Sequence, residues 1–172
     1  MNTFFVTGTD TDVGKTYATC VLLKKLKQAG MSTLAMKPVA AGCEETDDGT
    51  WCNDDALALQ SAMTAELPYR DLNPFALRCA IAPHIAAKES GCVIDSDLVV
   101  RRYSEIERKV DRAVVEGAGG WRVPLNWPEV DSSECETIAS LAKKLNFETF
   151  NMFLLFLSII KRFTYYSDIK FD

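Results

Sequence analysis

Short apolar runs alternate with longer amphipathic stretches along the chain as far as residue 115. Each apolar run is bounded by Gly, Pro or polar residues, which is typical of buried strands. The runs predicted as strands are 3–7, 33–37 and 113–115. The amphipathic stretches predicted as helices are 15–29, 54–63, 83–89 and 96–109. Strands that alternate with helices predict an α/β fold, in which helices cover both faces of a mostly parallel sheet.

The first predicted helix is supported by apolar side chains at helical spacing. These side chains are Ala18, Val21, Leu22, Leu26 and Ala29. Gly30 is expected to end the helix. The segments between the predicted elements are polar or rich in Pro and Asn. We expect a polar loop from 38 to 53 and an irregular stretch at 68–78.

Length and composition favour one domain with one sizeable core. The chain has 172 residues, of which 48% are hydrophobic, and a net charge of −5. This acidic balance, without a basic run, argues against nucleic acid or an anionic membrane surface as partners. Six cysteines without a C-x-x-C pair, and an N-terminus without a signal-peptide pattern, predict a cytoplasmic protein with free thiols. With one histidine and scattered cysteines, magnesium is the only metal that we expect.

The segment from Gly8 to Thr16, GTDTDVGKT, directly follows the first apolar run and resembles a phosphate-binding loop. Glycines allow several backbone N–H groups to converge on phosphate oxygens, and the helix that begins at Lys15 adds its positive dipole end. Lys15 would reach the terminal phosphates, and Thr16 offers a hydroxyl to Mg²⁺. Five residues separate Gly8 from Gly14, one more than in the strict G-x-x-x-x-G-K-[ST] pattern. The segment therefore predicts a variant loop that binds a nucleoside triphosphate.

Charged residues lie at the ends of the other two predicted strands. Lys37 ends the run 33–37, where a buried ammonium group would need a partner, and Glu116 follows the run 113–115. Because ligands bind at the carboxyl ends of strands in such folds, we expect both side chains to face one crevice with the phosphate loop. Glu116 is expected to end its strand and to lead into a flexible glycine-rich loop at 117–120. Its carboxylate is a candidate ligand for Mg²⁺, which prefers oxygen ligands.

A second candidate metal ligand lies at the start of the helix predicted at 54–63. Asn53 and Asp54 are candidates for the helix cap, and Asp55 is a candidate for metal binding. The residue pattern alone leaves open which of the two acids caps the helix and which binds the metal.

Five segments in register resemble the dethiobiotin synthetases of biotin biosynthesis. They are 7–16, 37–40 (KPVA), 53–59 (NDDALAL), 83–84 (PH) and 115–121 (VEGAGGW). Their order and spacing agree with that family over residues 1–147. The resemblance implies a P-loop NTPase-like fold and a reaction that makes dethiobiotin from 7,8-diaminononanoate, carbon dioxide and ATP. In that reaction one amine becomes a carbamate, the carbamate takes the γ-phosphate, and the second amine closes the cyclic urea and expels phosphate.

The resemblance also implies roles for individual residues. The implied nucleotide contacts are Asp12, Val13, Gly14, Lys15, Thr16, Tyr17, Asp55, Glu116, Gly117, Ala118 and Gly119. The implied metal ligands are Thr16, Asp55 and Glu116. The implied catalytic residues are Lys15, Lys37 and Thr11, and the implied substrate contacts are Thr11, Lys37, Ala41 and Gly120. No side-chain nucleophile is needed, because positioning and cations supply the catalysis.

The chain departs from this family in two places. Ala41 stands where the family usually has a serine that contacts substrate, so one hydrogen bond is expected to be missing or replaced by water. The family also continues for several dozen residues beyond the end of this chain, with an adenine-recognition segment and much of the surface of the family's homodimer. We therefore expect an incomplete ligase domain at 1–147, followed by an anomalous apolar tail at 148–172 that is not family-like.

The sequence leaves other interpretations open. The tail contains the run FLLFLSII at 153–160, shorter than the roughly 20 residues of a membrane-spanning helix. A shifted reading frame or early termination in the gene is the hypothesis we favour for the tail, against a membrane anchor or an element that fills the missing core. For the whole chain, the alternatives to a working ligase are a non-catalytic remnant of that enzyme and a partitioning or scaffold ATPase. Asp10 stands where such ATPase loops carry a signature lysine, which argues against the last alternative.

Overall fold

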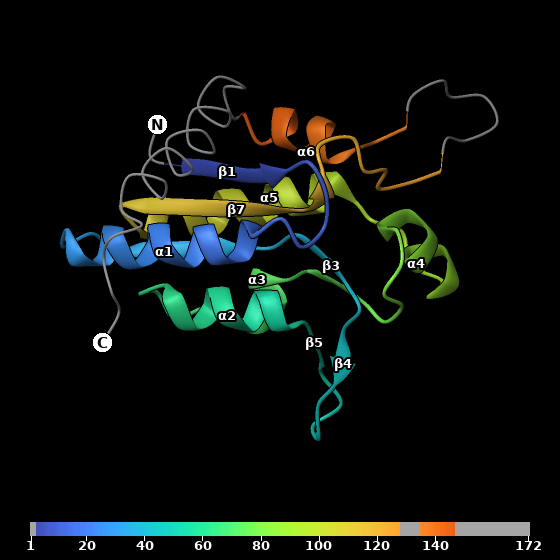
Figure 1. Ribbon diagram of the computed structural model, residues 1–172, viewed down its shortest axis with the longest axis horizontal. Helices are drawn as coiled ribbons and strands as arrows, with labels where there is room; N and C mark the ends of the chain where they lie inside the picture. Colours follow the sequence, from blue (N-terminus) through green and yellow to red (C-terminus); the bar gives the residue numbers. More distant parts are fainter. Residues whose placement is uncertain (1–2, 128–134, 147–172) are drawn as a thin grey trace.

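The computed structural model describes residues 3–127 and 135–146, and at its centre lies a parallel three-stranded sheet (Figure 1). Its strands are β1 (Thr3–Gly8), β7 (Arg112–Gly120) and β2 (Thr33–Met36), in the spatial order β1-β7-β2. Both neighbours run parallel to β7, with Val6 opposite Glu116 and Met36 opposite Val115. The mostly parallel α/β sheet expected from the alternating pattern is confirmed.

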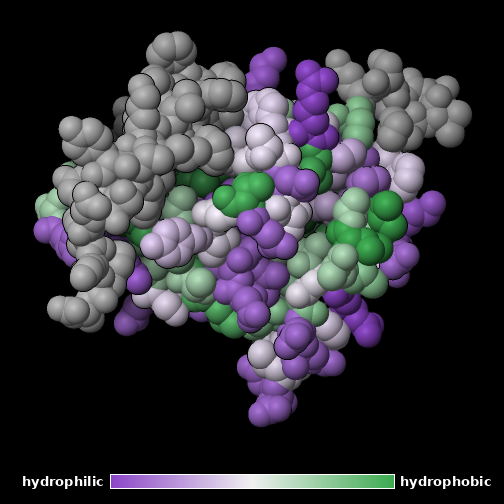
Figure 2. All heavy atoms as spheres, viewed as in Figure 1, coloured by the Kyte–Doolittle hydropathy of each residue, from purple (hydrophilic) through white to green (hydrophobic). Residues whose placement is uncertain are grey.

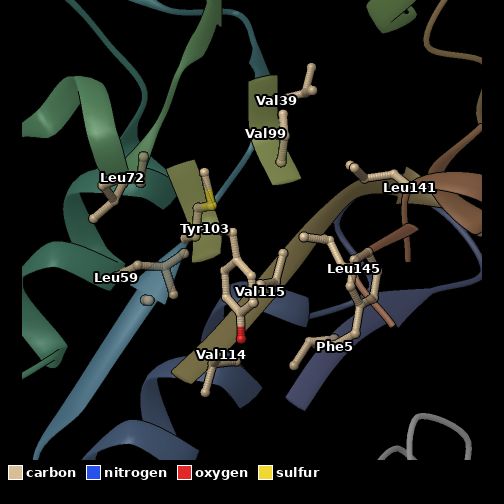
Figure 3. Close-up of a cluster of buried hydrophobic side chains, with 14 of the residues drawn as sticks. Phe5, Val39, Leu59, Leu72, Val99, Tyr103, Val114, Val115, Leu141 and Leu145 are labelled. Carbon is tan, nitrogen blue, oxygen red and sulfur yellow. The ribbon is translucent and has the colours of Figure 1, made fainter. Parts of the chain in front are cut away.

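Helices cover both faces of this sheet. The helices named here are α1 (Lys15–Gln28), α2 (Asp54–Ala62), α5 (Ser96–Ile106) and α6 (Ile138–Lys144). On one face, α1 packs against all three strands and α2 lies beside it. On the other face, Phe5 and Val115 point into a cluster with Tyr103 of α5 and Leu141 of α6, whereas Val114 points away from it (Figure 3). Strand side chains alternate between the two faces, and both faces of the central strand are therefore buried.

The buried side of α1 differs from the expected one. Lys15, Thr19 and Leu23, spaced four residues apart, are buried, while Ala29 is exposed. The expectation followed apolar residue types alone, but α1 begins at the phosphate loop, and the inward orientation of Lys15 determines which side faces the sheet. Thr19 tolerates burial because its hydroxyl donates to the Lys15 carbonyl oxygen at 2.9 Å. The helix ends before Gly30 as predicted, and that glycine has a left-handed backbone with φ 79°.

Two segments predicted as irregular contain regular structure. The strands there are β3 (Val39–Ala41), β4 (Glu44–Glu45), β5 (Trp51–Cys52) and β6 (Phe75–Leu77), and the short helix is α3 (Tyr69–Leu72). β3 pairs with β6 in parallel, and β4 pairs with β5 as an antiparallel hairpin. Figure 2 shows hydrophilic residues gathered over this projecting hairpin. The loop predictions were wrong because elements of two to four residues carry too little hydrophobic pattern to be detected.

The longer helices were predicted more closely. α4 (Pro83–Glu89) has the predicted bounds, and α2 ends one residue before the predicted end. The helix predicted at 96–109 ends as α5 at Ile106 and continues as the 3₁₀ helix η1 (Glu107–Lys109). Helix α6 was not predicted, although Thr137 and Ser140 form a capping box at its start.

β7 is the largest departure from the predicted elements. It extends to Gly120, so Glu116 lies inside a strand and 117–120 is not a flexible loop. After a register shift, Gly120 pairs with Gly8 at the end of β1. A Cβ on Gly120 would lie only 2.7 Å from the Thr9 carbonyl oxygen. The glycine-rich sequence therefore allows the backbone of the phosphate loop to lie directly against a strand.

Two expectations concern segments at the end of the chain. The predicted domain boundary at 147 and the apolar tail at 148–172 lie outside the described residues. Among the helices that the structure describes, none has the length and apolar character needed to cross a bilayer.

Candidate functional site

The segment that joins β1 to α1 leaves the start of α1 open. Gly14 is the N-cap residue with a left-handed backbone, φ 91°, and Asp12 is also left-handed at φ 57°. Within the described part of the chain, no side chain caps the first turn of α1, so its N–H groups are available to an anion. The buried Lys15 folds back over the loop, and its Nζ donates to the Asp10 carbonyl oxygen at 2.6 Å. This arrangement suits a phosphate group.

A cluster of charged side chains lies next to the phosphate loop. Lys37 Nζ donates to Asp55 Oδ2 at 2.8 Å and to Glu116 Oε1 at 2.7 Å. The same Glu116 oxygen accepts a hydrogen bond from the Thr16 hydroxyl at 2.7 Å. The Glu116 side chain is fully buried and that of Lys37 is 5% exposed, whereas that of Asp55 is 49% exposed. The buried ammonium group of Lys37, which was expected to need a partner, therefore has two, Asp55 and Glu116.

The electrostatics of this cluster differ between its two lysines. Burial lowers the pKa of Lys37, but the charge of Glu116 and the hydrogen bonds to Asp55 and Glu116 outweigh it, so the pKa lies above its ordinary value. Burial raises the pKa of Asp55, but the hydrogen bond and charge of Lys37, together with Thr16 and Lys15, outweigh burial and hold the pKa below its usual range. Burial, followed by the charge of Lys37, lowers the pKa of Lys15. An anion beside both ammonium groups would relieve their repulsion.

The residues of this cluster fit a magnesium ion. Thr16, Asp55 and Glu116 present oxygen atoms, the ligands that Mg²⁺ prefers. Glu116 Oε2 is buried and has no hydrogen-bond partner among the described residues. Such an acceptor is costly to bury, and a cation would satisfy it. Within residues 3–127 and 135–146 no group of three or more His, Cys, Asp or Glu is arranged to hold a metal ion. Two carboxylates and one hydroxyl leave the other positions of a Mg²⁺ shell to phosphate oxygens and water.

The start of α2 resolves which residue caps the helix. Asn53 is the N-cap residue, and its Oδ1 accepts a hydrogen bond from the Ala56 N–H at 3.4 Å. Asp54 is exposed, whereas Asp55 turns toward Lys37. Because an amide caps the helix, neither aspartate is needed there, and Asp55 is the acid that joins the cluster.

The other predicted site residues lie around the cluster at different exposures. Among the predicted site residues on the loop and the first turn of α1, the exposed ones are Thr11, Asp12, Val13, Gly14 and Tyr17. Gly119 comes close to Thr11, because a Cβ on this glycine would lie 3.8 Å from the threonine hydroxyl oxygen. Gly117 faces α6 instead, since a Cβ there would lie 2.9 Å from Ile138 Cγ2. The structure thus brings Gly119 and Gly120 close to the phosphate loop, whereas Gly117 lies against α6. Ala118, between them in the sequence, is half-buried.

Two polar residues next to the cluster were missed in the sequence. Asn73, 3% exposed, donates from Nδ2 to the Lys37 carbonyl oxygen at 2.7 Å. The Tyr69 hydroxyl lies 3.1 Å from Asn73 Oδ1 and donates to it. The available signal was the Asn73-Pro74 pair, which indicates a turn but not a partner across the fold. Ala41, half-buried, accepts at its carbonyl oxygen a hydrogen bond from Asn53 Nδ2 at 3.3 Å.

A family model and several curated proteins match most of this chain. A family model described as AAA domain matches residues 2–150. The ATP-dependent dethiobiotin synthetase BioD of Marinobacter nauticus is 52% identical over 126 residues, which make up 73% of this chain and 53% of that protein. The protein of the same name from Vibrio parahaemolyticus is 48% identical over 126 residues, 73% of this chain and 55% of that protein. The one from Cellvibrio japonicus is 48% identical over 142 residues, 83% of this chain and 59% of that protein.

The matched region is only part of these relatives. The chain spans between 53% and 59% of the length of the three curated proteins. All the elements that contribute Lys15, Thr16, Lys37, Asp55 and Glu116 lie inside the matched residues 2–150.

Proposed function

We propose a function on the premise that this chain belongs to the AAA domain family, whose model matches residues 2–150. The proposed function is an ATP- and Mg²⁺-dependent cyclo-ligase that makes dethiobiotin from 7,8-diaminononanoate and carbon dioxide. Similarity to curated ATP-dependent dethiobiotin synthetases supports it. The observation that carries it is the buried Lys37 ammonium group, held between Asp55 and Glu116 beside Thr16 of the phosphate loop.

In this proposal, the phosphate loop binds the triphosphate of ATP. The open first turn of α1 supplies N–H donors, and the ammonium group of Lys15 would leave the Asp10 carbonyl oxygen to meet the terminal phosphates. The same proposal places Asp12, Val13 and Tyr17 in contact with the nucleotide. Gly117, Ala118 and Gly119 complete its proposed contacts.

Magnesium, when bound, would neutralise developing charge on the transferred phosphoryl group. Thr16, Asp55 and Glu116 are its proposed ligands, because their oxygens converge and Glu116 Oε2 lacks another partner among the described residues. Lys37 already pairs with both carboxylates. It would therefore stay close to the phosphoryl group that the metal neutralises.

The proposed chemistry needs no protein nucleophile. One amine of the diamine bonds to the carbon of carbon dioxide and loses a proton, which gives a carbamate. A carbamate oxygen attacks the γ-phosphorus of ATP, ADP leaves, and a carbamic-phosphoric anhydride forms. The second amine attacks the carbonyl carbon of this anhydride and loses one proton to solvent, phosphate leaves with the bonding electrons, and the ureido ring closes. Thr11, Lys37, Ala41 and Gly120 are the proposed contacts of the diamine and its carbamate.

Lys37 would act on charge that moves during these steps. Carbamate and triphosphate are both anions, so their approach requires cations aimed at the oxygens between them. Lys37 and Lys15 are two buried ammonium groups, and burial, followed by the charge of Lys37, lowers the pKa of Lys15. The cytoplasmic homodimer implied by the family resemblance belongs to the same proposal.

The direct test is product formation by the purified 172-residue chain. With the diamine, bicarbonate and Mg-ATP, we expect dethiobiotin and ADP in equal amounts, measured by mass spectrometry. Lys15→Ala should abolish both products, because it removes a phosphate contact. Lys24→Ala is the matched control, since Lys24 lies exposed on the same helix.

The other outcomes separate the alternatives. Nucleotide binding without dethiobiotin would leave a non-catalytic remnant as the better interpretation. ATP hydrolysis that the diamine does not stimulate would favour a scaffold ATPase. Either result would refute the cyclo-ligase for this chain.

A further inference from the structure

Lys37 has an unusual backbone environment. It lies in the gap between β2 and β3, outside both strands, so its backbone N–H and carbonyl need partners from elsewhere. The segment containing α3 supplies the missing partners. The Lys37 N–H donates to the Leu72 carbonyl oxygen at 2.9 Å, and the Lys37 carbonyl oxygen accepts from Asn73 Nδ2 at 2.7 Å. The backbone of the central lysine is thus held by α3 rather than by its own sheet.

The hydroxyl of Tyr69 connects this lysine to the helix that carries Asp55. It accepts a hydrogen bond from the Asn53 N–H at 2.8 Å and donates one to Asn73 Oδ1 at 3.1 Å. Asn53 is the cap of α2, two residues before Asp55. Burial raises the pKa of Tyr69 to about 12, so the hydroxyl keeps its proton at neutral pH and can fill both roles.

These contacts form a closed ring. From the Lys37 carbonyl oxygen it passes through Asn73, the Tyr69 hydroxyl and Asn53 to α2. It returns through the 2.8 Å ion pair between Asp55 and the Lys37 ammonium group. We propose that Tyr69 is a positioning residue, whose hydroxyl sets the placement of Lys37 relative to Asp55 and Glu116 for the ligase reaction. The expected effect on catalysis rests on the proposed function, whereas the ring of hydrogen bonds does not depend on it.

The ring explains why a single hydroxyl would matter for the reaction. The Asp55 side chain is half exposed, and solvent weakens the ion pair of an exposed carboxylate. The buried Glu116 holds the ammonium group on one side, but the attraction of Asp55 alone fixes it only weakly on the other side. A misplacement of about 1 Å can cost on the order of a hundredfold in rate. The Tyr69 hydroxyl adds two uncharged, directional hydrogen bonds, one to Asn73 and one from Asn53, close to the backbone of Lys37 and of Asp55.

Tyr69→Phe removes the hydroxyl and keeps the ring of the side chain. The matched control is Tyr103→Phe, which removes a hydroxyl on the opposite face of the sheet. The Tyr103 hydroxyl also makes a partly buried hydrogen bond, which it donates to Thr3 Oγ1 at 2.6 Å. We expect kcat to fall about tenfold or more in Tyr69→Phe, with KM for ATP within about twofold, and kcat to stay unchanged in Tyr103→Phe. Thermal midpoints should fall by similar amounts in both variants.

A second measurement does not depend on turnover. Site-resolved acylation of lysines with acetic anhydride, read by mass spectrometry, reports how firmly the Lys37 ammonium group is held. We expect faster labelling of Lys37 in Tyr69→Phe than in Tyr103→Phe, with equal labelling of the exposed Lys24 in both. Equal Lys37 labelling in the two variants would overturn the positioning role, whether or not the chain makes dethiobiotin.

A double variant tests the ring as a unit. Tyr69 and Asn73 act through the same contact, so the kcat losses of Tyr69→Phe and Asn73→Ala should fail to multiply when combined. Losses that multiply in full would contradict the ring. Absence of product from the unsubstituted chain would instead refute the proposed function, and the labelling result would still decide the role of Tyr69.

Discussion

Lys37 is the residue on which the whole candidate site depends. Lys37→Met keeps most of the side-chain volume but leaves the fully buried Glu116 without a cation. Breaking a buried ion pair on one side costs about 3–5 kcal/mol. We therefore expect the thermal midpoint in Mg²⁺-free buffer to fall by roughly 10 °C. Added Mg²⁺ should restore part of the lost thermal midpoint, because the carboxylates of Asp55 and Glu116 then gain a cation. Scanning fluorimetry with and without Mg²⁺ measures both changes in the midpoint.

Lys144 provides the control for that prediction. Its ammonium group also pairs with two carboxylates, those of Asp97 and Glu136, but its side chain is 37% exposed. Exposed pairs contribute about 0–1 kcal/mol, so Lys144→Met should lower the midpoint slightly and should not respond to Mg²⁺. Equal losses in the two variants would contradict the burial argument. A Lys37→Met protein indifferent to Mg²⁺ would contradict the metal site.

Among the elements, those with a long hydrophobic pattern were predictable, and those held by distant backbone contacts were not. α4 has the bounds that its sequence predicted. Lys15, Lys37 and Glu116 could be proposed as site residues from the sequence, because each follows an apolar run or opens a helix. Asn73 was missed because its partner, the Lys37 carbonyl oxygen, is 36 residues away and has no side-chain signature.

The end of β7 shows the same limit. A glycine-rich run is usually a loop, and the run 117–120 was therefore predicted as a loop. The strand continues because the phosphate loop lies against it, so closely that a Cβ on Gly120 would lie 2.7 Å from the Thr9 carbonyl oxygen. The pairing of β1 with β7 over this segment depends on two parts of the chain at once, and no local pattern reports it.

Gly120→Ala tests whether this element shapes the nucleotide site. The added methyl group meets backbone, which cannot rotate away, so the phosphate loop must shift. We expect ATP affinity to fall by about tenfold or more, measured by calorimetry with Mg-ATP, because the loop N–H groups lose their convergence.

Gly117→Ala is the control on the same strand. Its methyl group would lie 2.9 Å from Ile138 Cγ2, on the α6 side, where side chains can adjust. Overpacking a core costs about 1–3 kcal/mol, so this variant should melt earlier. The proposed nucleotide contact of Gly117 is made by its backbone, which a methyl group directed toward Ile138 leaves in place, so ATP affinity should fall far less than in Gly120→Ala. An affinity loss of the same size in both variants would mean that general destabilisation, not the loop, is responsible.

The molecule as a whole couples the site to the stability of the described core. The site takes residues from α1, α2 and β7 and from the end of β2, and these elements pack on one sheet around a continuous set of buried side chains. A ligand that binds only the folded arrangement must therefore stabilise the whole core rather than one loop.

This coupling gives a test of nucleotide binding that is separate from turnover. At a concentration of Mg-ATP one hundred times the dissociation constant, stability should rise by about 2.7 kcal/mol. For a chain of this size that corresponds to roughly 5–10 °C in one cooperative transition. ATP with EDTA should give a smaller shift, because Glu116 Oε2 would remain without a cation. Lys15→Ala should give almost none. A transition that Mg-ATP does not move would show that this chain no longer binds nucleotide, whereas a full shift without product would place the failure at the chemical step.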